Sequence, residues 1–240
     1  MANKRALIMT RMEAPLSREA EWNDWYNNKY IPEHLKIPGF LAIRRFEVSK
    51  GFPKELIVPG PKYLTLVELI DTDVLTSKLY LSLYDKEASS PADSFEAIMA
   101  TCQNLSGGVY EQIYPDEGEY EIPDADKLLH AVGHADLPPE IEDEYNEWYV
   151  TEHIPSLMEI PGYLYARRFK RAKGEFSVVT GARISGPQYL AFYDITSNKI
   201  FESEAFKERS STPWMTRIRR WTFHRRQLND LYRGIYLAKR

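Results

Sequence analysis

The stretch 21-EWNDWYNNKYIPEHLKIPGFLAIRRF-46 is matched without a gap by 144-EYNEWYVTEHIPSLMEIPGYLYARRF-169, at an offset of 123 residues. Half of the aligned positions are identical, far more than chance would give over this length. A self-match of this kind indicates two copies of one structural unit. We therefore predict a first repeat over residues 1–122 and a second over residues 123–240, each the size of a small domain.

Hydrophobic patterns predict the same order of elements in each copy, β-α-β-β-α-β. In the second copy the expected strands are 128–135, 163–171, 188–195 and 221–228. This order is typical of a ferredoxin-like unit, an antiparallel four-stranded sheet with helices on one face. The sequence therefore predicts an α+β fold, in which the bare faces of two such sheets would cover each other. Two fused ferredoxin-like βαββαβ repeats would close a barrel of eight strands with helices outside and a ligand space between the sheets.

The composition indicates an ordinary globular protein. The net charge of −4 argues against a general nucleic-acid binder. The apolar run Ala6–Met9 is too short for a signal sequence or a membrane span. The single cysteine, Cys102, excludes an intrachain disulfide and fits a reducing compartment. We expect a cytoplasmic protein without a nucleic-acid or membrane partner.

The charge is unevenly distributed along the chain. From Arg209 to the end there are nine Lys or Arg residues and a single acid, Asp230. Such a stretch is either a solvated surface or a basic wall that faces an anionic ligand, and the sequence leaves both interpretations open.

The second copy carries the motif W-Y-x-x-x-H-I-P over residues 148–155, followed by I-P-G-Y and A-R-R-F. With these motifs the chain resembles the EthD-like branch of the dimeric α/β-barrel superfamily, and the resemblance covers both copies. It implies an intramolecular dimeric α/β barrel, and it leaves a homodimer open. The superfamily includes cofactor-free isomerases, decarboxylases, polyketide cyclases and dehydratases, quinol monooxygenases and haem enzymes, so the fold alone does not fix the reaction.

Residues that both copies share are expected to serve mainly the fold. Trp148 and Tyr149 recur as Trp25-Tyr26 and would belong to the buried stripe of a helix, or would line a pocket. Each copy also has an Arg-Arg pair on a strand, so its two side chains point to opposite faces. One arginine would reach the space between the sheets, as a structural ion pair or an anion clamp. The other would lie under the helices beside Glu21 or Glu144.

The histidines differ between the copies. His153 aligns with Tyr30, and a histidine at a helix break that titrates near neutrality suits a general base. Strand alternation places His130 and His134 on the face that looks into the barrel, where a buried polar group needs a partner or a ligand. We predict His153 and His134 as catalytic residues. The predicted substrate-binding residues are His130, Tyr149, Trp148, Arg167, Arg11, Tyr30 and Trp214.

These features favour a cofactor-independent lyase or isomerase, which would decarboxylate, dehydrate or cyclise a small aromatic or polyketide-like substrate by general acid–base chemistry. The substrate would be anionic or phenolic. A haem-binding oxidoreductase and a non-catalytic small-molecule-binding accessory protein are the alternatives. We expect no metal site, because no HxH or HExxH motif occurs. In addition, His130 and His134 would lie about 13 Å apart along a strand.

Overall fold

The computed structural model describes residues 4–88, 101–116, 122, 127–174, 176 and 186–240. Its strands are β1 (Ala6–Glu13), β2 (Phe40–Val48), β3 (Tyr63–Leu69), β4 (Gln103–Tyr114), β5 (Leu128–His134), β6 (Tyr163–Arg171), β7 (Tyr189–Ile195) and β8 (Arg226–Lys239). Its α-helices are α1 (Glu19–Trp25), α2 (Ile31–Leu35), α3 (Lys78–Ala88), α5 (Pro139–Trp148), α6 (Ile154–Met158), α7 (Glu204–Arg209) and α8 (Pro213–Thr222). The predicted boundary between the repeats adjoins residues 123–126, which lie outside the described residues.

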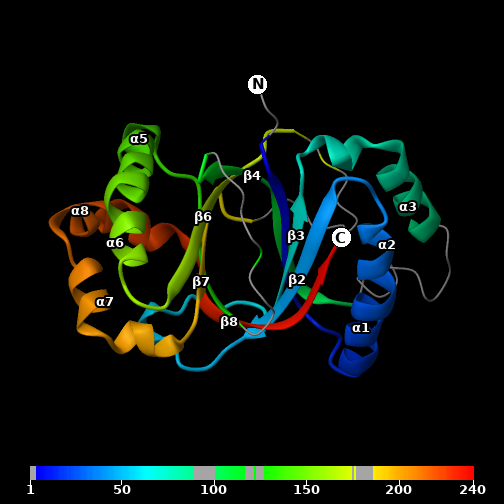
Figure 1. Cartoon of the computed structure of the whole chain (residues 1–240), viewed down its shortest axis with the longest axis horizontal. Coiled ribbons are helices and arrows are strands. Elements are labelled where there is room, and N and C mark those ends of the chain that lie inside the picture. The colour runs from blue at the N-terminus through cyan, green and yellow to red at the C-terminus, as the bar shows by residue number, and fades with distance from the viewer. Residues whose placement is uncertain (1–3, 89–100, 117–121, 123–126, 175, 177–185) are drawn as a thin grey trace.

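The strands form a closed barrel in the order β1-β3-β2-β8-β5-β7-β6-β4, and neighbouring strands are antiparallel. The two halves of the chain meet where β2 pairs with β8 and where β4 pairs with β6. Figure 1 shows α1, α2 and α3 outside one side of the barrel and α5 to α8 outside the other. The predicted α+β architecture, a closed eight-stranded barrel with external helices, is thereby confirmed.

The barrel interior is filled by side chains, so it does not offer the ligand space that the sequence predicts. An apolar cluster combines strands of both halves: Leu7, Met9, Phe46, Leu64, Leu66, Tyr110, Leu129, Ala131, Phe169, Leu190, Phe192, Leu228 and Tyr232. Two ion pairs join the halves within this interior. Arg44 Nη1 lies 2.6 Å from Asp194 Oδ1, and Arg167 donates to both oxygens of Glu68 at 2.7 and 2.9 Å.

The second arginine of each pair lies on the opposite face, under the helices, as strand alternation requires. The predicted partners are wrong, however, because Glu21 pairs with Arg18 and Glu144 with Arg217. Arg45 and Arg168 instead donate to helix asparagines at 2.7–2.8 Å: Asn23, Asn27 and Asn146. Uncharged partners suffice there because tyrosine rings also cover the guanidinium groups, with that of Arg168 at 4.0 Å from the Tyr149 ring centre.

The predicted orientation of β5 is also wrong. Leu129 and Ala131 belong to the interior cluster, whereas His130 and His134 line a cavity on the helix side. The cause is a one-residue shift between the copies. Met12 pairs with Tyr63 and His134 pairs with Tyr189, the first residues of β3 and β7, so β1 matches β5 at an offset of 122. A slip of one residue moves every side chain of a strand to the other face.

The helix between the first two strands of each half contains a five-residue π-helical segment, at Tyr26–Tyr30 and at Tyr149–His153. The chain then continues into α2 or α6, each with a proline in its first turn. The helix break expected at His153 is therefore a π-helical turn through which the helix continues. Helix α8 runs to Thr222, so the last strand begins at Arg226, later than predicted. No helix in the described part of the chain is long and apolar enough to cross a membrane.

Candidate functional site

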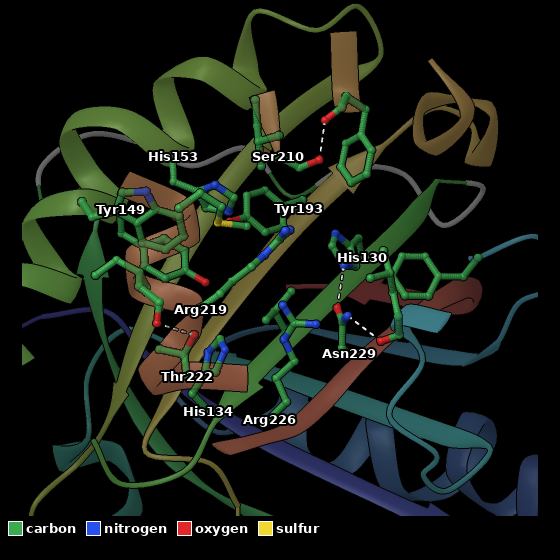
Figure 2. Close-up of a pocket in the computed structure, with 18 residues that line it drawn as sticks. His130, His134, Tyr149, His153, Tyr193, Ser210, Arg219, Thr222, Arg226 and Asn229 are labelled. Carbon is green, nitrogen blue, oxygen red and sulfur yellow. Dashed lines mark hydrogen bonds between the residues drawn. The ribbon is translucent and has the colours of Figure 1, made fainter. Parts of the chain in front are cut away.

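A cavity lies in the second half of the molecule, between the outer face of the sheet and the helices that cover it (Figure 2). Strands β5, β7 and β8 form its floor, and α5, the π-helical segment Tyr149–His153 and α8 form its walls. The cavity has a volume of about 60 Å³, which suits a small molecule. The first half contributes to the wall with Phe52 and Leu56, which follow β2.

The structure brings five of the nine predicted site residues together. The three histidines and two aromatic residues that line this cavity are His130, His134, Trp148, Tyr149 and His153. They come from β5 and from the helix that crosses it, two elements that are close together in the chain. The sequence analysis expected the β5 histidines on the opposite side of the sheet from this helix. Their convergence depends on the register shift of β5, which turns the histidines toward the helices.

The other four predicted residues lie elsewhere. Arg167 is bound to Glu68 inside the barrel, and Arg11 donates to the backbone oxygen of Gln227 at 3.3 Å. Tyr30 is buried in the first half. The Trp214 indole donates to Glu144 at 3.0 Å, away from the cavity. None of the four is among the residues that line the cavity.

His153 is the histidine most open to the cavity. Its ring stacks on Trp148 at 4.3 Å between centres and lies 6.2 Å from the Tyr193 ring. No hydrogen bond from a described residue holds its ring nitrogens, and the side chain is only partly buried. Burial, together with positive groups such as Arg219, lowers the pKa of His153 to about 3. The ring is therefore neutral and able to accept a proton.

His130 is held in one tautomer by its neighbours. Asn229 Nδ2 donates to the backbone oxygen of Leu56 at 2.7 Å, which fixes the amide so that its Oδ1 faces His130 Nε2 at 2.9 Å. Because Oδ1 can only accept, Nε2 carries the proton and Nδ1 is left as an acceptor. Burial lowers the pKa of His130 to about 4, against a smaller raising effect of the Asn229 hydrogen bond.

His134 lies at the end of β5, below the helix. Its Nδ1 is 3.0 Å from the Tyr145 hydroxyl, and its side chain is 5% exposed. Burial, and then the charges of Arg226 and Arg168, lower its pKa to about 3. Three neutral imidazoles therefore surround one cavity whose remaining walls are mostly apolar, including Leu157, Met215 and Ile218.

Sequence reasoning did not single out the two arginines of the site. Arg219 on α8 and Arg226 at the start of β8 both line the cavity, and Figure 2 shows them extending among the histidines. The only available signal was the basic stretch after Arg209, which fits a basic wall as well as a solvated surface. Among the described residues, no three His, Cys, Asp or Glu side chains lie close enough to hold a metal ion.

No family model matches the chain, and no curated protein matches it. Solved structures do match over nearly its whole length. An anthrone oxidase-like protein aligns with a TM-score of 0.61 at 11% identity, covering 99% of this chain and 93% of the other. A candidate monooxygenase from Fusobacterium nucleatum has a TM-score of 0.55 at 11% identity, with 100% and 96% covered. A candidate chlorite dismutase has a TM-score of 0.55 at 13% identity, with 98% and 96% covered.

At these identities the likeness shows the fold alone. The structural neighbours are dimeric α/β-barrel proteins, and this chain has the same closed barrel of eight strands.

Proposed function

We propose that the protein is a cofactor-independent acid–base enzyme of the lyase or isomerase type, which acts on a small aromatic substrate in the helix-side cavity. The observation that carries this proposal is the convergence of three neutral histidines, two buried and one partly buried, on one aromatic and aliphatic cavity. A neutral imidazole in a water-poor site is suited to take a proton from a carbon acid. The size of the cavity favours a single-ring substrate over a larger polyketide-like one.

His153 is the proposed general base because its ring nitrogens have no hydrogen-bond partner among the described residues and its side chain reaches the cavity. The base would take a proton from carbon, and the electron pair would move to a carbonyl oxygen of the substrate. Arg219 and Arg226 would stabilise the resulting enolate or phenolate. Negative charge on the substrate would offset the positive charge of Arg219 and raise the pKa of His153 toward neutrality.

The proposal extends to the organisation of the chain. Residues 1–122 and 123–240 would be fused ferredoxin-like repeats of EthD-like type, in support of which each half contributes four adjacent strands in the equivalent order. The second repeat would carry the chemistry, and the first would complete the barrel and supply Phe52 and Leu56 to the cavity. A homodimer and a cytoplasmic location belong to the same proposal. Light scattering of the purified protein tests the former.

Replacing His153 by Asn is expected to slow proton exchange about a hundredfold, which is a typical contribution of a general base. The measurement is deuterium incorporation next to the carbonyl of pyruvate and phenylpyruvate, followed by proton NMR in D₂O. These two molecules are carbon acids of different size, each with a carboxylate. The matched control is His224→Asn, because His224 is exposed on the surface. Wild-type exchange no faster than that of His153→Asn with both molecules would refute the proposal.

A haem does not fit this site. The wide, rigid macrocycle could enter this narrow cavity only if the lining side chains moved away. We therefore derive no step through haem. The accessory-protein alternative predicts that the wild-type protein retains its ligand but does not turn it over, so the exchange assay distinguishes it from an enzyme.

A further inference from the structure

Two arginines of the cavity have no carboxylate partner in the part of the chain that the structure describes. Arg219 makes no ion pair or hydrogen bond with any residue that the structure describes. Within the same described ranges, Arg226 makes no ion pair; its guanidinium carbon lies 5.8 Å from the centre of the Phe223 ring, its charge is near Tyr149 and Tyr145, and its buried Nε has no hydrogen-bond partner. Both side chains are partly buried. The cavity therefore contains two uncompensated positive charges.

The barrel interior shows how this protein treats other buried arginines. Arg44 is paired with Asp194 and Arg167 with both oxygens of Glu68, and these pairs lie within 2.6–2.9 Å. Burying a charge without a partner is costly, so folded proteins normally pair it or leave it for a ligand. Arg45 and Arg168, buried under the helices, have no carboxylate but still donate to asparagine oxygens. The cavity arginines differ from all of these because neither makes a hydrogen bond with a described residue, which indicates that they are kept for a partner that the chain does not supply.

The three histidines of the cavity do not supply that partner. They are neutral, so none offers a negative charge to the arginines. Burial and then the charge of Arg226 lower the pKa of Arg219, which shows that the two guanidinium groups repel each other. A single anion between the two guanidinium groups would offset their repulsion and accept hydrogen bonds from the N–H groups of both.

We propose that Arg219 and Arg226 form an anion-binding subsite that takes the carboxylate of a small organic acid with an apolar, single-ring body. This inference rests on the proposed function in that it places the ligand in the same cavity. The body of the ligand would pack on the apolar walls, which include Phe52, Met215 and Ile218. Two guanidinium groups suit the planar, two-oxygen head of a carboxylate, and the apolar walls exclude a bare inorganic anion as the preferred ligand.

The test is the binding of benzoate, measured by titration calorimetry, with benzamide as its uncharged analogue. Wild-type protein is expected to bind benzoate at least about tenfold more tightly than benzamide. Arg219→Gln and Arg226→Gln are each expected to weaken benzoate binding about tenfold and to leave benzamide binding unchanged. The matched control is Arg220→Gln, which removes the same charge from an exposed position of α8 and is expected to bind benzoate as the wild type does.

Folding of the variants is checked by thermal melting without ligand. Arg219→Gln is expected to melt no lower than the wild type, because it removes a repulsion and breaks no ion pair of the described residues. Equal affinity for benzoate and benzamide, no binding of benzoate, or an equal loss of affinity in Arg220→Gln would each overturn the subsite.

Failure of the subsite and failure of the proposed enzyme give different results. His153→Asn changes the base but not the arginines, so its benzoate binding is expected to remain sensitive to Arg219→Gln and Arg226→Gln. Arginine-dependent benzoate binding without any proton exchange would leave the subsite intact and refute the enzyme. Proton exchange that does not respond to Arg219→Gln or Arg226→Gln would overturn the subsite and the stabilising role of the arginines, and would leave only His153 as the base.

Discussion

Glu68→Gln is expected to lower the free energy of unfolding by about 3–5 kcal/mol, the usual effect of removing one partner of a buried ion pair. Glu68 is 5% exposed, and it accepts both hydrogen bonds of the Arg167 fork from the other half of the chain. Arg44 Nη2 lies 3.6 Å from the same carboxylate. The substitution keeps the shape of the side chain but leaves two buried guanidinium groups with one carboxylate, that of Asp194. Denaturant unfolding at pH 7 measures the loss.

The control for Glu68→Gln is Glu21→Gln, which breaks the exposed pair with Arg18. Exposed pairs contribute about 0–1 kcal/mol, so this variant is expected to unfold almost as the wild type does. Burial raises the pKa of Glu68, but the charge and hydrogen bonds of Arg167 and the charge of Arg44 outweigh it, and the net pKa is lowered. The stabilisation is therefore present above the ordinary pKa of 4.5 and is lost as the pH falls below it. Equal stability of the two variants at pH 7 would contradict the prediction.

The barrel could be predicted from the sequence because the repeated segment is long and contains features of the backbone itself. Gly39 and Gly162 both have positive φ, at 96° and 105°, in the turn that leads into the second strand of each half. A residue with a side chain is disfavoured in that conformation, so the Pro-Gly turn is retained in both copies. The opposite orientations of the two arginines in each Arg-Arg pair were also predicted correctly, because neighbouring residues of a strand must point to opposite faces.

The site could not be predicted to the same extent, because its geometry depends on a single residue of register. The gap-free match covers residues 21–46 and 144–169 at an offset of 123, whereas the structure pairs the first strands of the two halves at an offset of 122. Strand side chains alternate with a period of two, so a difference of one residue in the offset placed His130 and His134 on the wrong face of the sheet in the prediction. Arg219 and Asn229 lie far along the chain from the histidine motif, and only the closed barrel brings β8 beside β5.

The corrected register explains why the described residues at the equivalent place of the first half are apolar instead of histidines. At an offset of 122, Ile8 and Met12 of β1 take the places of His130 and His134. Both belong to the apolar cluster that packs β1 against α1 and α2. Tyr30 occupies the place of His153, and it stacks on the buried His34 ring at 3.8 Å. The first half thus fills with side chains the volume that the second half leaves open.

His34→Leu is expected to make the protein less sensitive to acid. His34 is 1% exposed, its Nδ1 donates to the Tyr30 backbone oxygen at 2.8 Å, and its buried Nε2 has no hydrogen-bond partner. Burial lowers its pKa from 6.5 to about 4, against a smaller raising effect of the Tyr30 hydrogen bond. The unfolded chain therefore takes up a proton at a higher pH than the folded chain does. Stability from this residue is complete above pH 6.5 and falls as the pH approaches 4.

The expected size follows from the difference in proton binding. One histidine that is neutral when folded and protonated when unfolded costs about 1.4 kcal/mol per pH unit. Between pH 6.5 and pH 4 the contribution of His34 therefore amounts to about 3 kcal/mol. Leucine is a suitable replacement because the aligned position of the second copy, Leu157, is a buried leucine in the same turn of the helix. At pH 8 we expect a change of about 1 kcal/mol or less, the value of one hydrogen bond.

The measurement is a series of denaturant titrations from pH 8 to pH 5, above the range in which Glu68 titrates. Over that range the free energy of unfolding of the wild type is expected to fall by about 2 kcal/mol more than that of His34→Leu. The control is His224→Leu, which makes the same substitution at an exposed position. The two profiles would run parallel if His34 were protonated in the folded protein, and that result would show that burial does not keep this ring neutral. The same comparison with His130→Leu would then decide whether the cavity histidines are neutral, as the proposed chemistry requires.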